Sequence, residues 1–194
     1  MDLVHSILSD STLQNEIASR YGFPSPINCQ LLLQGVNDTY LITVGGHKYI
    51  FRLFRYQRKS FDAICEEVAL VNFLQHKSHL VAKLQANLSG EIIQSFAMPE
   101  GERYGILMEC AANTEFETHC LVAGGSYSYG KSIAELHRHL TDFTPQKQST
   151  LLNLDHLAWQ PIKLASKQFP DEDLSYLRYE EGRIRDWLGR NENM

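Results

Sequence analysis

The sequence lacks the signals that place a protein in or across a membrane. No run approaches the roughly 18 apolar residues of a membrane span. The N-terminus, MDLVHSILSD, has an acid at its second position and no apolar core segment, unlike a secretory signal. We therefore expect a cytoplasmic protein with no membrane partner.

An excess of positive charge is also absent. The chain has 18 basic and 23 acidic residues, a net charge of −5, which gives no electrostatic footprint for nucleic acid. One local basic cluster stands out, formed by Arg52, Arg55, Arg58 and Lys59. The four cysteines form no C-x-x-C pair and the eight histidines form no H-E-x-x-H. We expect reduced thiols, no metal site and no nucleic-acid partner.

What is present is ordinary globular composition, with 43% hydrophobic and 21% charged residues in 194. That length fits a small lobe plus part of a second. Residues 11–21 are predicted to form a helix that ends at Gly22. Strands are predicted at 27–34, 39–44 and 47–54, with the pair Gly45-Gly46 closing a tight hairpin between the last two.

The apolar period changes to that of a helix over residues 61–76, and three β-prone runs follow at 80–85, 91–96 and 104–109. A polar stretch near 110–114 precedes a helix predicted at 129–140. Two more helices are predicted after it, divided by Pro170. The predicted class is α+β, with an antiparallel sheet and one helix packed on it, followed by an all-helical segment.

Two features of the first half have the residue types of an anion site. Gly35-Val36-Asn37-Asp38 lies at the predicted turn between the first two strands, where glycine permits close backbone approach and Asn37 or Asp38 tolerates unusual dihedral angles. Such a sequence is also compatible with an ordinary β-turn.

Arg52 is the second feature. Alternation along the strand places it between Ile50 and Phe54 on one face, and a guanidinium between apolar neighbours needs an anion. On the 61–76 helix, Glu67 projects within the apolar stripe, whereas Glu66 is predicted to point to solvent. Either Arg52 and Glu67 form an ion pair, or Arg52 extends to solvent and Glu67 lies at the edge of the stripe.

Five motifs follow one another at fitting distances: G-x-N-x-x-Y (35–40), Y-I-F-R-L (49–53), E-V-A-L-V-x-x-L (67–74), I-L-M-E (106–109) and Y-G-K-S-I-A-E-L-H (129–137). In this order the chain resembles the aminoglycoside phosphotransferase and type II homoserine kinase superfamily over most of residues 30–190. The tail LDHLAWQPIKLASKQFPDEDLSYL is similar to the helical insert of bacterial members that include the stress-response protein kinase.

The resemblance implies a protein-kinase-like fold: an N-lobe with a nucleotide site (1–110), a hinge (111–125) and a partial helical C-lobe (126–194). It implies ATP as cofactor, with Arg52 on the phosphates and Glu67 orienting it. His137 matches a helix histidine that we interpret as a packing residue. The other implied binding residues are Gly35 and Asn37 at the turn, Ile50 over adenine, and Met108, Glu109, Cys110 and Ala111 at the hinge.

Two departures from the family pattern stand out. Asn113 or Thr114 occupies a place past the hinge where the family usually has glycine. The catalytic loop H-x-D-x-x-x-x-N and the later aspartate that holds Mg²⁺ are missing. A near match, Asp186 with Asn191, has Ile184 in place of histidine and belongs to a predicted helix.

The sequence therefore predicts the N-terminal part of an ATP-dependent phosphotransferase for a hydroxyl of a small molecule or protein, inactive as this chain, with Mg²⁺ bound only in the full-length enzyme. The alternatives are a pseudokinase-like module that binds nucleotide or a partner, and a plain α+β interaction domain. Apolar surface on the helices after residue 126 predicts self-association.

Overall fold

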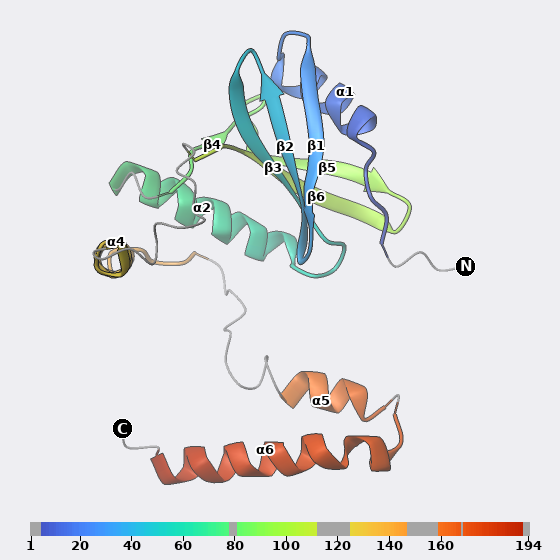
Figure 1. Cartoon of the computed structure of the whole chain (residues 1–194), viewed down its shortest axis with the longest axis vertical. Coiled ribbons are helices and arrows are strands. Elements are labelled where there is room, and N and C mark those ends of the chain that lie inside the picture. The colour runs from blue at the N-terminus through green and yellow to red at the C-terminus, as the bar shows by residue number, and fades with distance from the viewer. Residues whose placement is uncertain (1–4, 78–80, 112–124, 147–158, 168, 192–194) are drawn as a thin grey trace. The chain divides into compact units, whose positions relative to one another are not determined.

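The computed structural model describes residues 5–77, 81–111, 125–146, 159–167 and 169–191 (Figure 1). The chain divides into two compact units, Met1–Gln148 and Ser149–Met194, and each is described here by itself. The first unit contains a six-stranded antiparallel sheet with helices, so the predicted α+β class is confirmed.

The first helix, α1 (Asp10–Tyr21), begins and ends at recognisable capping residues. The Ser9 side chain accepts a hydrogen bond from the Thr12 N–H, and Gly22 ends the helix in the left-handed region at φ 65°. Leu13, Ile17 and Tyr21 of α1 are buried against one face of the sheet.

The sheet has the order β1-β2-β3-β6-β4, and β5 pairs with β6. Its hairpin between β2 and β3 turns through Gly45 and Gly46, at φ 55° and 81°, the geometry that glycine adopts most readily. The predicted strand positions are confirmed to within a few residues, although little of the 80–85 run is a strand. The strands are β1 (Ile27–Gln34), β2 (Asn37–Val44), β3 (His47–Phe54), β4 (Leu84–Gln85), β5 (Ile93–Met98) and β6 (Gly101–Glu109).

Each face of the sheet has its own apolar cluster. On the α1 face, Tyr40, Phe51 and Leu107 are buried together with the α1 side chains. On the other face, Phe54 and Ile106 pack against Ile64 and Val68 of α2 (Phe61–Lys77). Alternation along each strand distributes the residues between these clusters, so Phe51 and Arg52 of β3 point to opposite faces.

Glu66 corrects the sequence-based prediction for α2. It is 8% exposed instead of pointing to solvent, and its Oε1 accepts the Gln146 N–H at 3.1 Å. The segment after α4 (Gly125–Leu140) covers this side of the helix, since the Phe143 ring lies against the Phe73 ring with centroids 5.3 Å apart. A helical period marks the apolar stripe, but it cannot show that a second segment lies beside it.

Asp38 corrects the prediction for the turn. Asn37 and Asp38 belong to β2, and neither has a positive φ. Asp38 is 0% exposed, and its Oδ2 lies 2.6 Å from Nη2 of Arg103 on β6. Asp38 therefore has a structural role in the lobe, because a buried carboxylate requires a partner.

The helices of the second half bury little within the described structure. None of the described residues of α4 (Gly125–Leu140) is buried, and His137 is exposed, so its packing role stays a prediction. The second unit holds α5 (Gln160–Ala165) and α6 (Asp171–Asn191), as the sequence predicted on either side of Pro170. Among the described helices, none has the length and apolarity needed to cross a membrane.

Candidate nucleotide site

Strand register places Arg52 on the α2 face of the sheet, between β2 and β6. It pairs with Thr39 of β2 on one side and with Ile106 of β6 on the other. Two residues earlier, Ile50 pairs with Met108 of β6, and both side chains are half-buried. This face therefore carries an apolar pair next to the Arg52 cation.

The predicted ion pair between Arg52 and Glu67 is confirmed. Nη1 of Arg52 lies 2.8 Å from Oε1 of Glu67, with the two side chains 30% and 21% exposed. The guanidinium also lies 5.7 Å from the centre of the Phe54 ring, within the range of a cation–π contact. Glu67 thus fixes the direction of Arg52 while part of the guanidinium stays accessible.

Lys59 is a site residue that the sequence analysis named only as part of a basic cluster. Its Nζ bonds Oε2 of Glu67, the oxygen that Arg52 leaves unoccupied, and it too lies 5.7 Å from the Phe54 ring centre. The concentration of Arg52, Arg55, Arg58 and Lys59 was a visible signal. Which of these cations reaches the carboxylate depends on the path of the loop between β3 and α2.

The turn between β1 and β2 is shorter than the predicted turn over residues 35–38, because Asn37 and Asp38 belong to β2. The Gly35 N–H donates to the Asn37 carbonyl at 3.1 Å, and Gly35 has no positive φ. A bulge between Leu31 and Leu33 shifts the register of β1, which places Leu33 beside Thr39 on the Arg52 face. Leu33 is 63% exposed, an apolar side chain over this face that the sequence alternation did not predict.

The predicted hinge begins where β6 ends. The Glu109 N–H donates to the Lys83 backbone carbonyl at 2.8 Å, and the Cys110 N–H donates to the Lys48 backbone carbonyl at 3.0 Å. These two donors are therefore used within the lobe. Ala111 is the next residue and is exposed; Asn113 and Thr114 lie outside the described residues.

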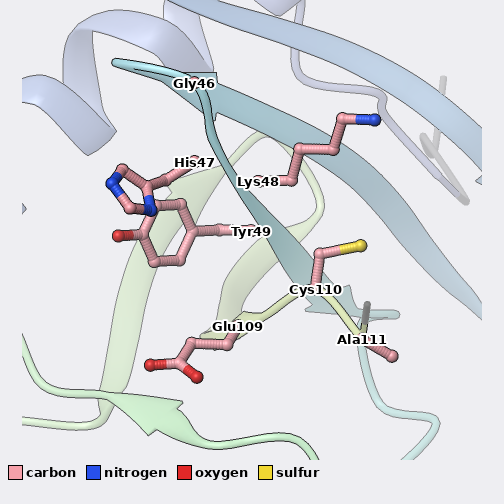
Figure 2. Close-up of a pocket in the computed structure, with 7 residues that line it drawn as sticks. All are labelled: Gly46, His47, Lys48, Tyr49, Glu109, Cys110 and Ala111. Carbon is pink, nitrogen blue, oxygen red and sulfur yellow. The ribbon is translucent and has the colours of Figure 1, made fainter. Parts of the chain in front are cut away.

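A cavity of about 340 Å³ lies at the hinge edge. Figure 2 shows that its side chains come from both faces: His47, Tyr49 and Glu109 point to one side, and Lys48 and Cys110 to the other. Neither Arg52 nor Glu67 lines it. Because Tyr49 packs with the α1-face cluster, we regard this cavity as adjacent to the Arg52 site and separate from it.

The near match to a catalytic loop lies within a continuous helix. Ile184, Asp186 and Asn191 all belong to α6, as predicted. The intervening Arg185 pairs with Glu181 at 2.7 Å and stacks over Trp159 at 4.2 Å. A regular helix cannot supply the open loop on which a catalytic aspartate acts, so this stretch is structural.

No family model matches the sequence. The chain is 28% identical over 160 residues to an uncharacterized protein of Synechocystis sp., covering 79% of this chain and 42% of the relative. It is 25% identical over 171 residues to an uncharacterized protein of Deinococcus radiodurans, covering 87% and 48%. The chain thus spans about half the length of these relatives.

Three solved structures resemble the fold. An amicoumacin kinase in complex with AMP-PNP, Ca²⁺ and Ami has a TM-score of 0.72 at 15% identity. The match covers 93% of this chain and 54% of the kinase chain. A microcompartment-associated aminopropanol kinase has a TM-score of 0.63 at 21% identity, covering 76% and 46%. A spectinomycin phosphotransferase with ADP and spectinomycin has a TM-score of 0.59 at 11% identity, covering 96% and 58%.

The fold is protein-kinase-like. These likenesses confirm the fold that the sequence resemblance implied, and all three neighbours are kinases or phosphotransferases. The identities are too low to carry residue roles across. The roles of the Arg52 site therefore depend on its own geometry.

Proposed function

We propose that the first unit of this chain is the nucleotide-binding lobe of an ATP-dependent phosphotransferase. The observation that carries the proposal is the contact between Arg52 and Glu67, 2.8 Å long and partly accessible. A kinase lobe needs a cation that contacts the ATP phosphates and a carboxylate that orients this cation. Membership of the aminoglycoside phosphotransferase superfamily is part of this proposal.

The adenine ring would lie on the apolar pair next to Arg52. Ile50 and Met108 are cross-strand partners, and they present a flat, half-buried surface between Arg52 and the hinge. Since the N–H groups of Glu109 and Cys110 already have partners, we assign the donor to the adenine edge to Ala111 and the acceptor to the Glu109 carbonyl. Gly35 and Asn37 would place the β1–β2 turn over the phosphates.

Transfer itself needs groups that these 194 residues do not carry. The sequence has no H-x-D-x-x-x-x-N loop, and among the described residues no three His, Cys, Asp or Glu side chains come together to hold a metal. We propose that this chain is inactive alone and that the complete enzyme, located in the cytoplasm, binds Mg²⁺ and an acceptor elsewhere. Because the structural neighbours act on small molecules, a small hydroxyl compound is the favoured acceptor.

Calorimetry with ATP tests the proposal directly. Wild-type chain should bind ATP, and Arg52→Ala should weaken binding by about tenfold or more, the usual cost of losing a hydrogen bond to a charged group. Arg58→Ala removes a charge of the same sign from the adjoining loop and is the matched control. The proposal fails if the wild type does not bind ATP, or if Arg52→Ala binds it equally well.

A second candidate is a non-catalytic, pseudokinase-like module, favoured by the missing catalytic loop. Sequencing the DNA downstream of codon 194 separates the two candidates. An H-G-D-x-x-x-x-N motif there, in frame or shifted, supports the phosphotransferase fragment, and its absence supports the module.

Self-association is also proposed, through the exposed aromatic side chains of α4. Tyr127 and Tyr129 are 78% and 63% exposed, and exposed apolar surface is typical of protein association sites. Sedimentation over a range of concentrations measures the association. Replacing both tyrosines by serine should reduce it.

A further inference from the structure

The loop between β3 and α2 brings a second cation to the carboxylate that orients Arg52. Oε1 of Glu67 bonds Nη1 of Arg52 and Oε2 bonds Nζ of Lys59. One negative charge is thus shared by two positive charges, and the three side chains together carry a net positive charge. An ion pair that only stabilised the fold would need one cation.

Both cations remain accessible to a ligand. The side chains of Arg52 and Lys59 are 30% and 37% exposed, against 21% for Glu67. Each cation lies 5.7 Å from the centre of the Phe54 ring. Phe54 and Glu67 therefore hold the two cations side by side, with the polar ends free to donate further hydrogen bonds.

The cations lie at the end of the sheet where the β1–β2 turn begins. Thr39 pairs with Arg52, and Asn37 pairs with Phe54, so the turn before Asn37 lies beyond the Phe54 ring. The stretch between Arg52 and Ser60 contains no acidic residue, so the β3–α2 loop adds only positive charge here. A chain of negative groups lying between the turn and the sheet would meet both cations.

We propose that Lys59 and Arg52 form a two-cation clamp for the polyphosphate of a nucleoside di- or triphosphate, with Glu67 as the shared positioning residue. This inference rests on the proposed function and adds a residue to it. Such a clamp binds nucleotides more tightly than nucleosides, because both cations attract the polyphosphate. A nucleoside without phosphate gains no binding energy from either cation.

The test compares ADP with adenosine by calorimetry on five forms of the chain: wild type, Arg52→Met, Lys59→Met, Lys59→Arg and Arg58→Met. Arg58 lies next to Lys59 on the same loop and makes no contact with Glu67 among the described interactions, so its variant controls for the general loss of positive charge. Lys59→Met should lower ADP affinity by about fivefold or more and leave adenosine affinity unchanged. Lys59→Arg should restore most of the ADP affinity.

The outcomes separate the inference from the proposed function. If Arg52→Met weakens ADP binding while Lys59→Met matches Arg58→Met, the clamp is wrong and the nucleotide site stands. Equal losses for ADP and adenosine in Lys59→Met would show a structural role and would overturn the clamp as well. If the wild type binds neither ADP nor ATP, both proposals are wrong. Thermal unfolding of each variant checks that the lobe remains folded.

Discussion

Arg103 of β6 and Asp38 of β2 form an ion pair in which both side chains are 0% exposed. The guanidinium has further partners: Nε donates to the Phe54 carbonyl at 2.9 Å and Nη1 donates to the Ser6 carbonyl at 2.8 Å. It therefore ties β2, the end of β3 and the segment before α1 to β6. The Arg52 site lies on the opposite face of the same strands.

Arg103→Met should destabilise the protein strongly. It leaves Asp38 as a buried carboxylate without its cation, a change that costs about 3–5 kcal/mol in other proteins. Urea unfolding followed by circular dichroism measures the loss. Arg183→Met is the control, since that side chain is 63% exposed in an i,i+3 pair worth at most about 1 kcal/mol. Equal effects of the two variants would contradict a structural role for the buried pair.

Gly105→Ala should destabilise the sheet, because the new Cβ would overlap the Phe51 ring, which is 0% exposed. Overpacking of this kind costs about 1–3 kcal/mol. Gly130→Ala in α4 is the matched change, with nothing within 4 Å of the added atom. It should be neutral or stabilise the helix by up to about 1 kcal/mol. Thermal melts distinguish the two, and the prediction is wrong if Gly105→Ala melts at the wild-type temperature.

Glu100 should contribute stability that depends on pH. Burial opposes ionisation of this carboxyl, but hydrogen bonds from the Ser6 hydroxyl and N–H outweigh it and lower the pKa. A folded pKa below the unfolded value of about 4.3 means that the stabilisation is complete above that value. It is lost as pH falls through the folded pKa.

The stability margin of wild type over Glu100→Gln should therefore shrink as the pH falls below the unfolded pKa of about 4.3. Urea unfolding at several pH values measures it. Ser6→Ala removes the hydroxyl donor to Glu100 and should reduce the margin at neutral pH in the same direction. A margin that stays constant as the pH falls would contradict the assignment.

Cys29 should react slowly with alkylating reagents. Burial, together with the Asp10 carboxylate, raises the pKa of its thiol to about 11. The reactive thiolate is therefore depleted at pH 8 by roughly two orders of magnitude relative to an ordinary cysteine. Cys65 and Cys110 are half-buried and should be modified first. Mass spectrometry of peptides after iodoacetamide treatment gives the order, and early labelling of Cys29 would show that this part of the sheet opens readily.

Local pattern in the sequence determined most of the elements of the first unit. The Gly45-Gly46 turn predicted the β2–β3 hairpin, and strand alternation placed Arg52 opposite to Phe51. The helical period placed Glu67 on the face of α2 that turns toward the sheet. These predictions succeeded because each depends on spacings of a few residues. Strand and helix geometry determine from such spacings the face toward which each side chain points.

Only the tertiary structure decided which groups meet over long separations. Asp38 was expected in a flexible turn, but Arg103, 65 residues later, makes it part of the buried core. Glu66 was expected in solvent, but the backbone of Gln146 covers it. Lys59 reaches Glu67 from the end of a turn in the β3–α2 loop, in which the Arg58 N–H donates to the Arg55 carbonyl. The sequence by itself determined which faces of β3 and α2 carry Arg52 and Glu67, but the ion pair between them was decided by the tertiary structure. The partners of Asp38, Glu66 and Lys59 likewise follow from packing between segments, which no local period encodes.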